Sequence, residues 1–295
     1  MGSRLKAWSF HLLPHHLVSR VTYWFTRRRG PWVPALIRWF VKRYRVDLSE
    51  AQRPDPASYA TFNAFFVRAL RPGARPLEGD EDTVVSPADG RIQALGKLDS
   101  GRLLQAKGMP FTAERLLGGD PRDARPFDEG AWCTVYLSPR DYHRVHMPCA
   151  GRLRRMIHVP GRLYTVAPFA TRHIPGLFAR NERVVCWFET AHGPMAVVLV
   201  GAINVAAIET VWAGAVTPAR RGGIRRWEYG GEGPRLPRGA ELGRFNMGST
   251  VIVLLATPVQ WNPVLAPERP VRVGQALGRC PAQARDQSNG STAPI

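Results

Sequence analysis

The sequence predicts an α+β protein in which N-terminal amphipathic helices lead into a β-rich domain, sandwich- or barrel-like. Apolar residues recur at helical spacing over residues 14–44, a pattern that is typical of helices with one apolar face. From residue 83 the pattern changes to short apolar or alternating runs that turn residues separate. The 28 glycines and 26 prolines among 295 residues also favour many turns over long helices.

Two helices are expected first, one over residues 14–28 and one that begins close to Pro34. Residues 1–46 contain ten Lys or Arg residues and no acidic residue, together with many aromatic side chains. This composition is typical of helices that lie in a membrane interface, and the uncharged stretches are shorter than the ~20 apolar residues that span a bilayer. We therefore expect residues 1–55 to associate with a membrane surface. The alternative is that their apolar faces pack on the rest of the protein.

A third helix is predicted over residues 56–70, because Asp55 can cap its first turn and phenylalanines form an apolar stripe along it. Strands are predicted at 90–95, 131–137, 152–159, 184–188, 195–200, 205–211 and 251–256. The Arg-, Gly- and Pro-rich residues 218–244 are expected to form a long loop, and residues 281–295 a disordered tail. We therefore assign one β-rich domain to residues 56–280.

The net charge of +18 indicates an anionic partner, either nucleic acid or anionic lipid. The basic residues gather among aromatic ones at the N-terminal end, which favours an anionic membrane surface. No nucleic-acid recognition motif accompanies the charge, so nucleic acid is not expected as a partner. The four cysteines have no CxxC spacing, so neither a zinc site nor a disulfide framework is expected.

Three short segments supply the groups of an activated serine. Asp89 lies in an Asp-Gly turn, His143 and His146 lie three residues apart, and Ser249 begins an apolar run. In such a site a histidine takes the hydroxyl proton and an aspartate orients the imidazole. A metal site is not expected, because no Cys or carboxylate cluster accompanies the histidines. The pattern leaves open a serine hydrolase that does not cleave itself, and a basic membrane-binding protein without enzymatic activity.

Ser249 lies between Gly248 and Thr250, which does not match the Gly-x-Ser-x-Gly turn of common hydrolases. A serine in this position can attack the carbonyl group of the residue before it. Gly248 has no side chain to block that approach. The attack would split the chain and replace the serine nitrogen with a ketone oxygen.

Taken together, these segments resemble the phosphatidylserine decarboxylase family, specifically its bacterial membrane-associated (type I) proenzymes. The resemblance covers about residues 56–278 and is carried by Ser86–Gly90, Tyr142–Pro148, Leu177–Val184, Ile208–Gly214 and Gly243–Val251. The family usually has Leu-Gly-Ser-Thr at its processing site, and this chain has Met247 in place of the leucine. Because the two side chains have similar volumes, we still expect processing.

The resemblance implies self-cleavage between Gly248 and Ser249, with Asp89, His146 and Ser249 as the self-cleavage triad. Ser249 would become a covalent pyruvoyl group, the cofactor of the reaction. This group would form a Schiff base with the amine of phosphatidylserine and act as an electron sink. The implied reaction is decarboxylation of phosphatidylserine to phosphatidylethanolamine and CO2 in phospholipid biosynthesis.

The resemblance also implies a β chain of residues 1–248 and an α chain of residues 249–295 that stay together, and a homodimer is possible. His143 is expected to donate the proton that quenches the carbanion. The enzyme is expected at the cytoplasmic side of the cell membrane as a peripheral protein, where its anionic substrate lies. The arginines that could contact the substrate phosphate include Arg144, Arg152, Arg154, Arg155 and Arg180.

Overall fold

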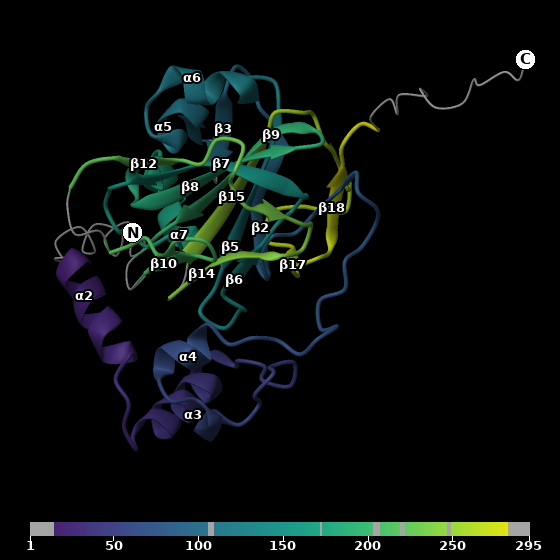
Figure 1. The fold of residues 1–295 in the computed structure, drawn as a ribbon. Coiled ribbons are helices and arrows are strands. Elements are labelled where there is room, and N and C mark those ends of the chain that lie inside the picture. Colours follow the sequence, from purple (N-terminus) through teal and green to yellow (C-terminus); the bar gives the residue numbers. More distant parts are fainter. Residues whose placement is uncertain are drawn as a thin grey trace, which may run out of the picture.

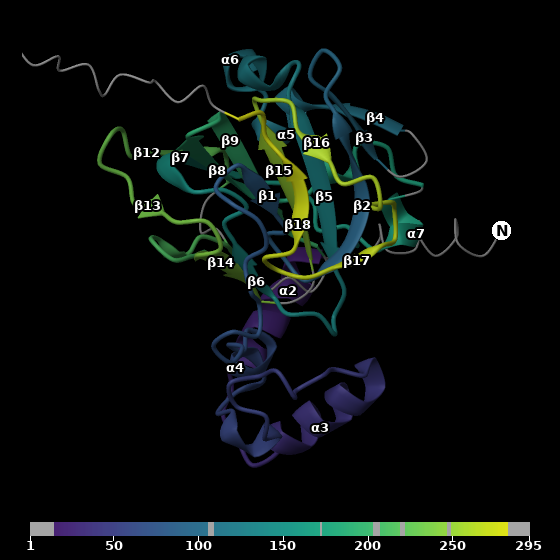
Figure 2. The same ribbon diagram turned by 90° about the vertical axis from the view of Figure 1, so that its right-hand side faces the viewer.

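The computed structural model describes residues 15–105, 109–171, 173–202, 207–218, 222–246 and 249–282. N-terminal helices precede a domain that consists mainly of antiparallel strands, so the predicted α+β class is confirmed (Figure 1). The helices are α2 (His15–Thr26), α3 (Val33–Tyr44), α4 (Phe62–Phe66), α5 (Ala113–Leu117), α6 (Pro121–Ala124), α7 (Pro168–Thr171) and α8 (Leu177–Arg180), with 3-10 turns η2 (Pro56–Ser58) and η4 (Arg125–Phe127). Helices α3 and α4 lie at one end of the β-rich domain, and α5 and α6 lie at the opposite end (Figures 1 and 2).

A large antiparallel sheet forms the centre of the β-rich domain. Its strands in spatial order are β12 (Arg225–Glu228), β7 (Gly151–Val159), β8 (Arg183–Thr190), β9 (Gly193–Val200), β15 (Ser249–Leu255), β5 (Ala131–Leu137), β2 (Gly90–Lys97) and β17 (Pro270–Val271), and β13 (Arg235–Leu236) also pairs with β7. Every residue of β15 is buried. A strand that is buried on both faces has a nearly continuous apolar sequence, which is why the sequence alone identified it.

Three smaller antiparallel sheets pack around this one. A four-stranded sheet contains β11 (Gly214–Ala215), β10 (Ile208–Thr210), β14 (Glu241–Phe245) and β6 (Arg144–His146). A three-stranded sheet contains β1 (Thr83–Val85), β18 (Ala276–Arg279) and β16 (Gln260–Trp261), and β3 (Arg102–Gln105) pairs with β4 (Met109–Thr112). The four-stranded sheet positions the site, because only residues 246–248 separate β14 from β15.

Helix α3 packs on the segment that follows it. Val33, Ile37 and Phe40 are buried at helical spacing and share a small core with Phe65 and Phe66. The apolar face of α3 therefore packs within the protein and not against a membrane.

Helix α2 has the opposite arrangement. Leu17, Val21 and Trp24 are 59%, 58% and 58% exposed, whereas Ser19 and Thr26 are buried. Its apolar face therefore points away from the β-rich domain. Among the described residues, no helix is long and apolar enough to cross a membrane.

The prediction of one helix over residues 56–70 is wrong. Asp55 caps only the turn η2, where its side chain accepts a hydrogen bond from the amide of Ala57. Thr61 then adopts an extended conformation, and its side chain caps a second helix, α4, through the amide of Ala64. The second cap divides the predicted helix into two short pieces.

The predicted loop over residues 218–244 is also wrong in part, because β12, β13 and the start of β14 lie in it. The strands β12 and β13 have several arginines. Their sequences therefore lack the alternation of apolar and polar residues by which strands are recognised. Of the strand predicted at 205–211, the structure shows β10, and residues 205 and 206 lie outside the described residues. Residues 283–295 of the predicted tail also lie outside the described residues.

Candidate active site

Asp89 and Ser249 lie at the same edge of the central sheet. Ser249 pairs with Leu137 at the end of β5, and on the other side of β5 Arg91 pairs with Tyr136. The strand β5 therefore lies between Ser249 and the start of β2, which Asp89 precedes. With neighbouring strands about 4.8 Å apart, the two backbones are about 10 Å apart.

Gly90 lets this edge form. A Cβ atom there would lie 2.2 Å from the carbonyl oxygen of Tyr136, a distance that no side chain tolerates. Glycine thus allows β2 to begin in close contact with β5. The close contact fixes the position of the turn that carries Asp89.

Ser249 is fully buried, and its Oγ atom has no hydrogen-bond partner among the described residues. A buried hydroxyl group without a partner is costly. Met247 and Gly248 lie outside the described residues, and the position of the predicted scissile bond is therefore not described. The hydroxyl is available for chemistry at the start of β15.

His146 ends β6 beside the turn that contains Asp89, where its amide donates to the carbonyl oxygen of Pro87 at 2.8 Å. Its Nδ1 atom lies 2.8 Å from the carbonyl oxygen of Gly239, and its Nε2 atom lies 3.1 Å from the hydroxyl of Tyr142. A carbonyl oxygen can only accept, so Nδ1 carries the proton and Nε2 is the acceptor. Burial lowers the pKa of His146, which keeps the imidazole neutral at pH 7.

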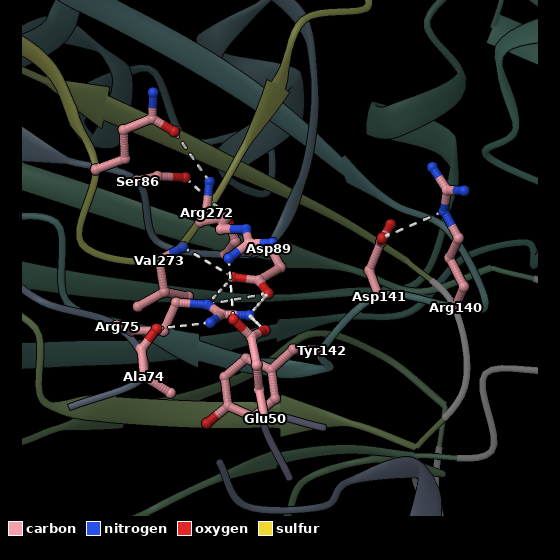
Figure 3. A network of polar contacts seen from close by, with 12 residues as sticks. Glu50, Ala74, Arg75, Ser86, Asp89, Arg140, Asp141, Tyr142, Arg272 and Val273 are labelled. Atoms are coloured by element: carbon pink, nitrogen blue, oxygen red, sulfur yellow. Dashed lines mark hydrogen bonds and ion pairs between the residues drawn. The ribbon is translucent and has the colours of Figure 1, made fainter. Parts of the chain in front are cut away.

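The carboxylate of Asp89 is held by Arg75 (Figure 3). The Nε atom of Arg75 donates to Oδ1 at 2.9 Å, its Nη2 atom donates to Oδ2 at 2.5 Å, and the amide of Val273 donates to Oδ1 at 2.9 Å. Among the described residues, no hydrogen bond joins Asp89 to His146 or His146 to Ser249. The influence of Asp89 on His146 is electrostatic, since its negative charge partly offsets the effect of burial on the pKa of the imidazole.

His143 is fully buried directly before the first residue of β6, and its ring centroid lies 4.1 Å from that of Phe66. Its Nδ1 atom donates to the carbonyl oxygen of Asp141 at 2.8 Å, and Nε2 has no partner among the described residues. Burial lowers the pKa of His143 to about 3. The group is therefore neutral at pH 7, with a free lone pair on Nε2.

The backbone brings His143 close to the segment that precedes Ser249. The carbonyl oxygen of His143 accepts a hydrogen bond at 3.0 Å from the amide of Phe245, the last residue of β14. The next residue, Asn246, is fully buried, and its side chain donates to Glu209 Oε1 at 2.9 Å. Glu209 also accepts from Arg27, just beyond α2, at 3.1 Å. These contacts connect α2 to the residues that lead to Ser249.

Arg75, Gly239 and Glu209 were not among the predicted site residues. No local pattern marks Arg75 or Gly239, and Glu209 lies in the recognised segment Ile208–Gly214 but was given no role. Tyr142 was included in a recognised motif but was given no role. A tyrosine four residues before a histidine was the one signal that could have suggested its contact.

The arginines that were candidates for phosphate binding already contact groups of the protein. Their partners are Glu241 for Arg144, the Gly231 carbonyl for Arg152, Glu189 for Arg154, Asp123 for Arg155 and the ring of Tyr164 for Arg180. None of these five is a free cation next to the site.

The chain is similar to known proteins over most of its length. The family model described as phosphatidylserine decarboxylase matches residues 62–279, and a second one, described as PSD, matches residues 5–45. The phosphatidylserine decarboxylase proenzyme of Methylococcus capsulatus is 54% identical over 272 residues, which are 92% of this chain and 94% of the relative. The proenzyme of Stutzerimonas stutzeri is 52% identical over 285 residues, 95% of each chain. The chain therefore belongs to the phosphatidylserine decarboxylase family.

Proposed function

We propose that this enzyme decarboxylates phosphatidylserine to phosphatidylethanolamine with a pyruvoyl group that it makes from its own Ser249. The observation that carries the proposal is the fully buried Ser249 hydroxyl, which has no partner among the described residues. A pyruvoyl group has a methyl group where serine has its hydroxymethyl group. Conversion would therefore remove the unpaired polar atom from the core, so the site fits the group.

Self-cleavage begins when the Ser249 Oγ atom attacks the carbonyl carbon of Gly248. The C–O bond forms while the C–N bond breaks, and the acyl group passes from nitrogen to oxygen. Elimination then releases residues 1–248 as a carboxylate chain, and hydrolysis of the remaining enamine releases ammonia. The residues 249–295 keep a ketone at their first position.

His146 is the base in this proposal, because its neutral Nε2 atom is an acceptor. The hydroxyl of Tyr142 occupies that atom in the described state, so the contact must exchange before His146 can take the Ser249 proton. Asp89 would then stabilise the imidazolium by its charge. Its ion pair with Arg75 keeps the carboxylate in place for this role.

In decarboxylation, the ketone would supply an electron sink for the electrons of the breaking carbon–carboxylate bond. His143 is proposed as the proton donor, but its low pKa means that it must first receive a proton. The ammonium group of phosphatidylserine can supply it, because an amine must lose a proton before it attacks a carbonyl group. The Nε2 atom of His143 would hold this proton and deliver it to the carbon that has lost CO2.

The enzyme is proposed to act as a peripheral protein at the cytoplasmic face of the cell membrane. Support comes from α2, whose apolar side chains Leu17, Val21 and Trp24 are exposed close to the exposed basic residues Arg28 and Arg29. Such a surface can insert apolar groups among acyl chains and attract anionic headgroups. The homodimer remains a prediction.

The test is the Ser249→Ala variant, analysed by denaturing electrophoresis and by conversion of phosphatidylserine in detergent micelles. We expect one intact chain without activity. Thr134→Val is a matched control, because Thr134 is also a buried hydroxyl without a partner but lies in the middle of β5. This control should give two chains. An intact Ser249→Ala chain that still forms phosphatidylethanolamine would refute the proposal.

A further inference from the structure

A cavity of about 270 Å³ lies between the N-terminal helical segment and the edge of the central sheet. Arg45, which follows α3, and Arg68, which follows α4, line one side. Asp89 and Arg91, at the start of β2, line the other side. Figure 3 shows the Asp89 side of this region, with Tyr142 next to it.

The carboxylates that line the cavity all have donors from the protein. Asp47 accepts from the Ser49 amide, Glu50 from Arg75 and Arg272, Asp89 from Arg75 and the Val273 amide, and Asp141 from the amide and hydroxyl of Ser138. None of these four carboxylates is therefore left without a hydrogen-bond donor.

Three arginines of the cavity, Arg45, Arg68 and Arg91, have no carboxylate partner among the described residues. Arg68 is the most unusual, because it is only 5% exposed. Its guanidinium has a long hydrogen bond of 3.4 Å to the carbonyl oxygen of Arg140 and lies 5.5 Å from the ring of Phe65, and its Nε atom has no partner. The negative charges of Asp89 and Asp141 act on Arg68 without a direct ion pair, and burial still lowers the pKa of its guanidinium. A buried guanidinium without a hydrogen-bonded counterion is costly, which points to an anion that is supplied from outside.

The cavity adjoins the candidate active site. Tyr142 lines it, and the hydroxyl of Tyr142 contacts His146. Arg68 lies two residues after Phe66, whose ring packs on His143, and the charge of Arg68 contributes to the low pKa of His143. A ligand held by Arg68 would therefore lie beside both histidines.

We propose that this cavity binds the phosphodiester group of the phospholipid substrate, with Arg68 as its principal ligand. The inference rests on the proposed function and specifies how the headgroup is held. The substrate carboxylate is the less suitable anion, because a buried guanidinium would stabilise the charge that decarboxylation must remove. The phosphodiester keeps its charge from substrate to product, so Arg68 can hold it throughout turnover.

The test compares mature wild-type enzyme with Arg68→Gln, after electrophoresis has shown the same two chains in both. Binding of dihexanoyl phosphatidylethanolamine is measured by titration calorimetry, since this product has the phosphodiester but no carboxylate. We expect binding at least about tenfold weaker and a similar rise in KM for phosphatidylserine, with kcat within about twofold. Arg68→Lys should recover part of the loss. Arg71→Gln, an exposed arginine outside the cavity, should match wild type.

Product binding that is unchanged in Arg68→Gln would overturn the proposal, and a KM that rises while product binding is unchanged would place the carboxylate at Arg68. If dihexanoyl phosphatidylglycerol binds wild type without displacing the product, and this binding is lost in Arg68→Gln, the cavity holds a bystander lipid, which also contradicts the proposal. If Arg68→Gln does not mature, Arg45→Gln and Arg91→Gln should each weaken product binding by about threefold, and wild-type affinity in both would refute it. Failure of wild type to form phosphatidylethanolamine would instead reject the proposed function.

Discussion

The ion pair between Arg75 and Asp89 should make a large contribution to stability. The two side chains are only 11% and 12% exposed, and Arg75 contacts both carboxylate oxygens as well as Glu50 at 2.9 Å. In Arg75→Met, the Asp89 carboxylate would keep only the hydrogen bond from the Val273 amide. Removal of one partner of a buried pair lowers the free energy of unfolding by about 3–5 kcal/mol. Because this pair is slightly exposed, we expect a loss at the lower end, about 3 kcal/mol.

A double-mutant cycle measures this coupling. Arg75→Met, Asp89→Asn and the double variant are compared by urea unfolding in a Ser249→Ala background, so that every sample is one chain. Because the double variant removes both charges, its loss should be at least about 2 kcal/mol smaller than the sum of the single losses. Losses that add within about 0.5 kcal/mol would show that the two side chains do not interact as described.

Three further results are expected. His143→Ala should still be cleaved but lose about 10²–10⁴-fold in turnover, measured with phosphatidylserine in micelles, and an uncleaved product would contradict the assigned role. The Ser249→Ala precursor should lose up to about 5 kcal/mol of stability as pH falls from 6.5 to about 3, because the unfolded chain takes up a proton that buried His143 does not accept. Urea unfolding across this range should show a smaller loss in His143→Gln, and equal losses would refute the explanation. Deletion of residues 1–46 should abolish sedimentation with anionic liposomes, and undiminished sedimentation would place the membrane contact elsewhere.

The sequence predicted those parts of the fold that depend on local patterns. The run at 131–137 has the bounds of β5, and the amphipathic pattern of 33–44 corresponds to α3. The prediction of a single helix over residues 56–70 was wrong because Thr61 interrupts it. Thr61 is extended, and its side chain caps the new helix α4. The edge strands β12 and β13 were missed because they expose several of their side chains, so that no apolar alternation marks them.

The site was predictable only where the chain itself carries a motif. Ser249, His146 and Asp89 each lie in a short recognisable segment, and the structure brings His146 next to the turn of Asp89. Arg75 and Arg68 lie in the segment after α4, and neither has a pattern that connects it to β2. Their roles depend on how the N-terminal segment packs against the sheet, which is a tertiary contact that local sequence does not encode.

The intact mass of purified wild-type protein tests the central claim most directly. The account predicts two chains that separate between residues 248 and 249, with the smaller chain lighter by one ammonia molecule than an unmodified chain that begins with Ser249. Borohydride reduction should add two hydrogen atoms to it. A single chain of 295 residues that nevertheless converts phosphatidylserine at full rate would contradict the account.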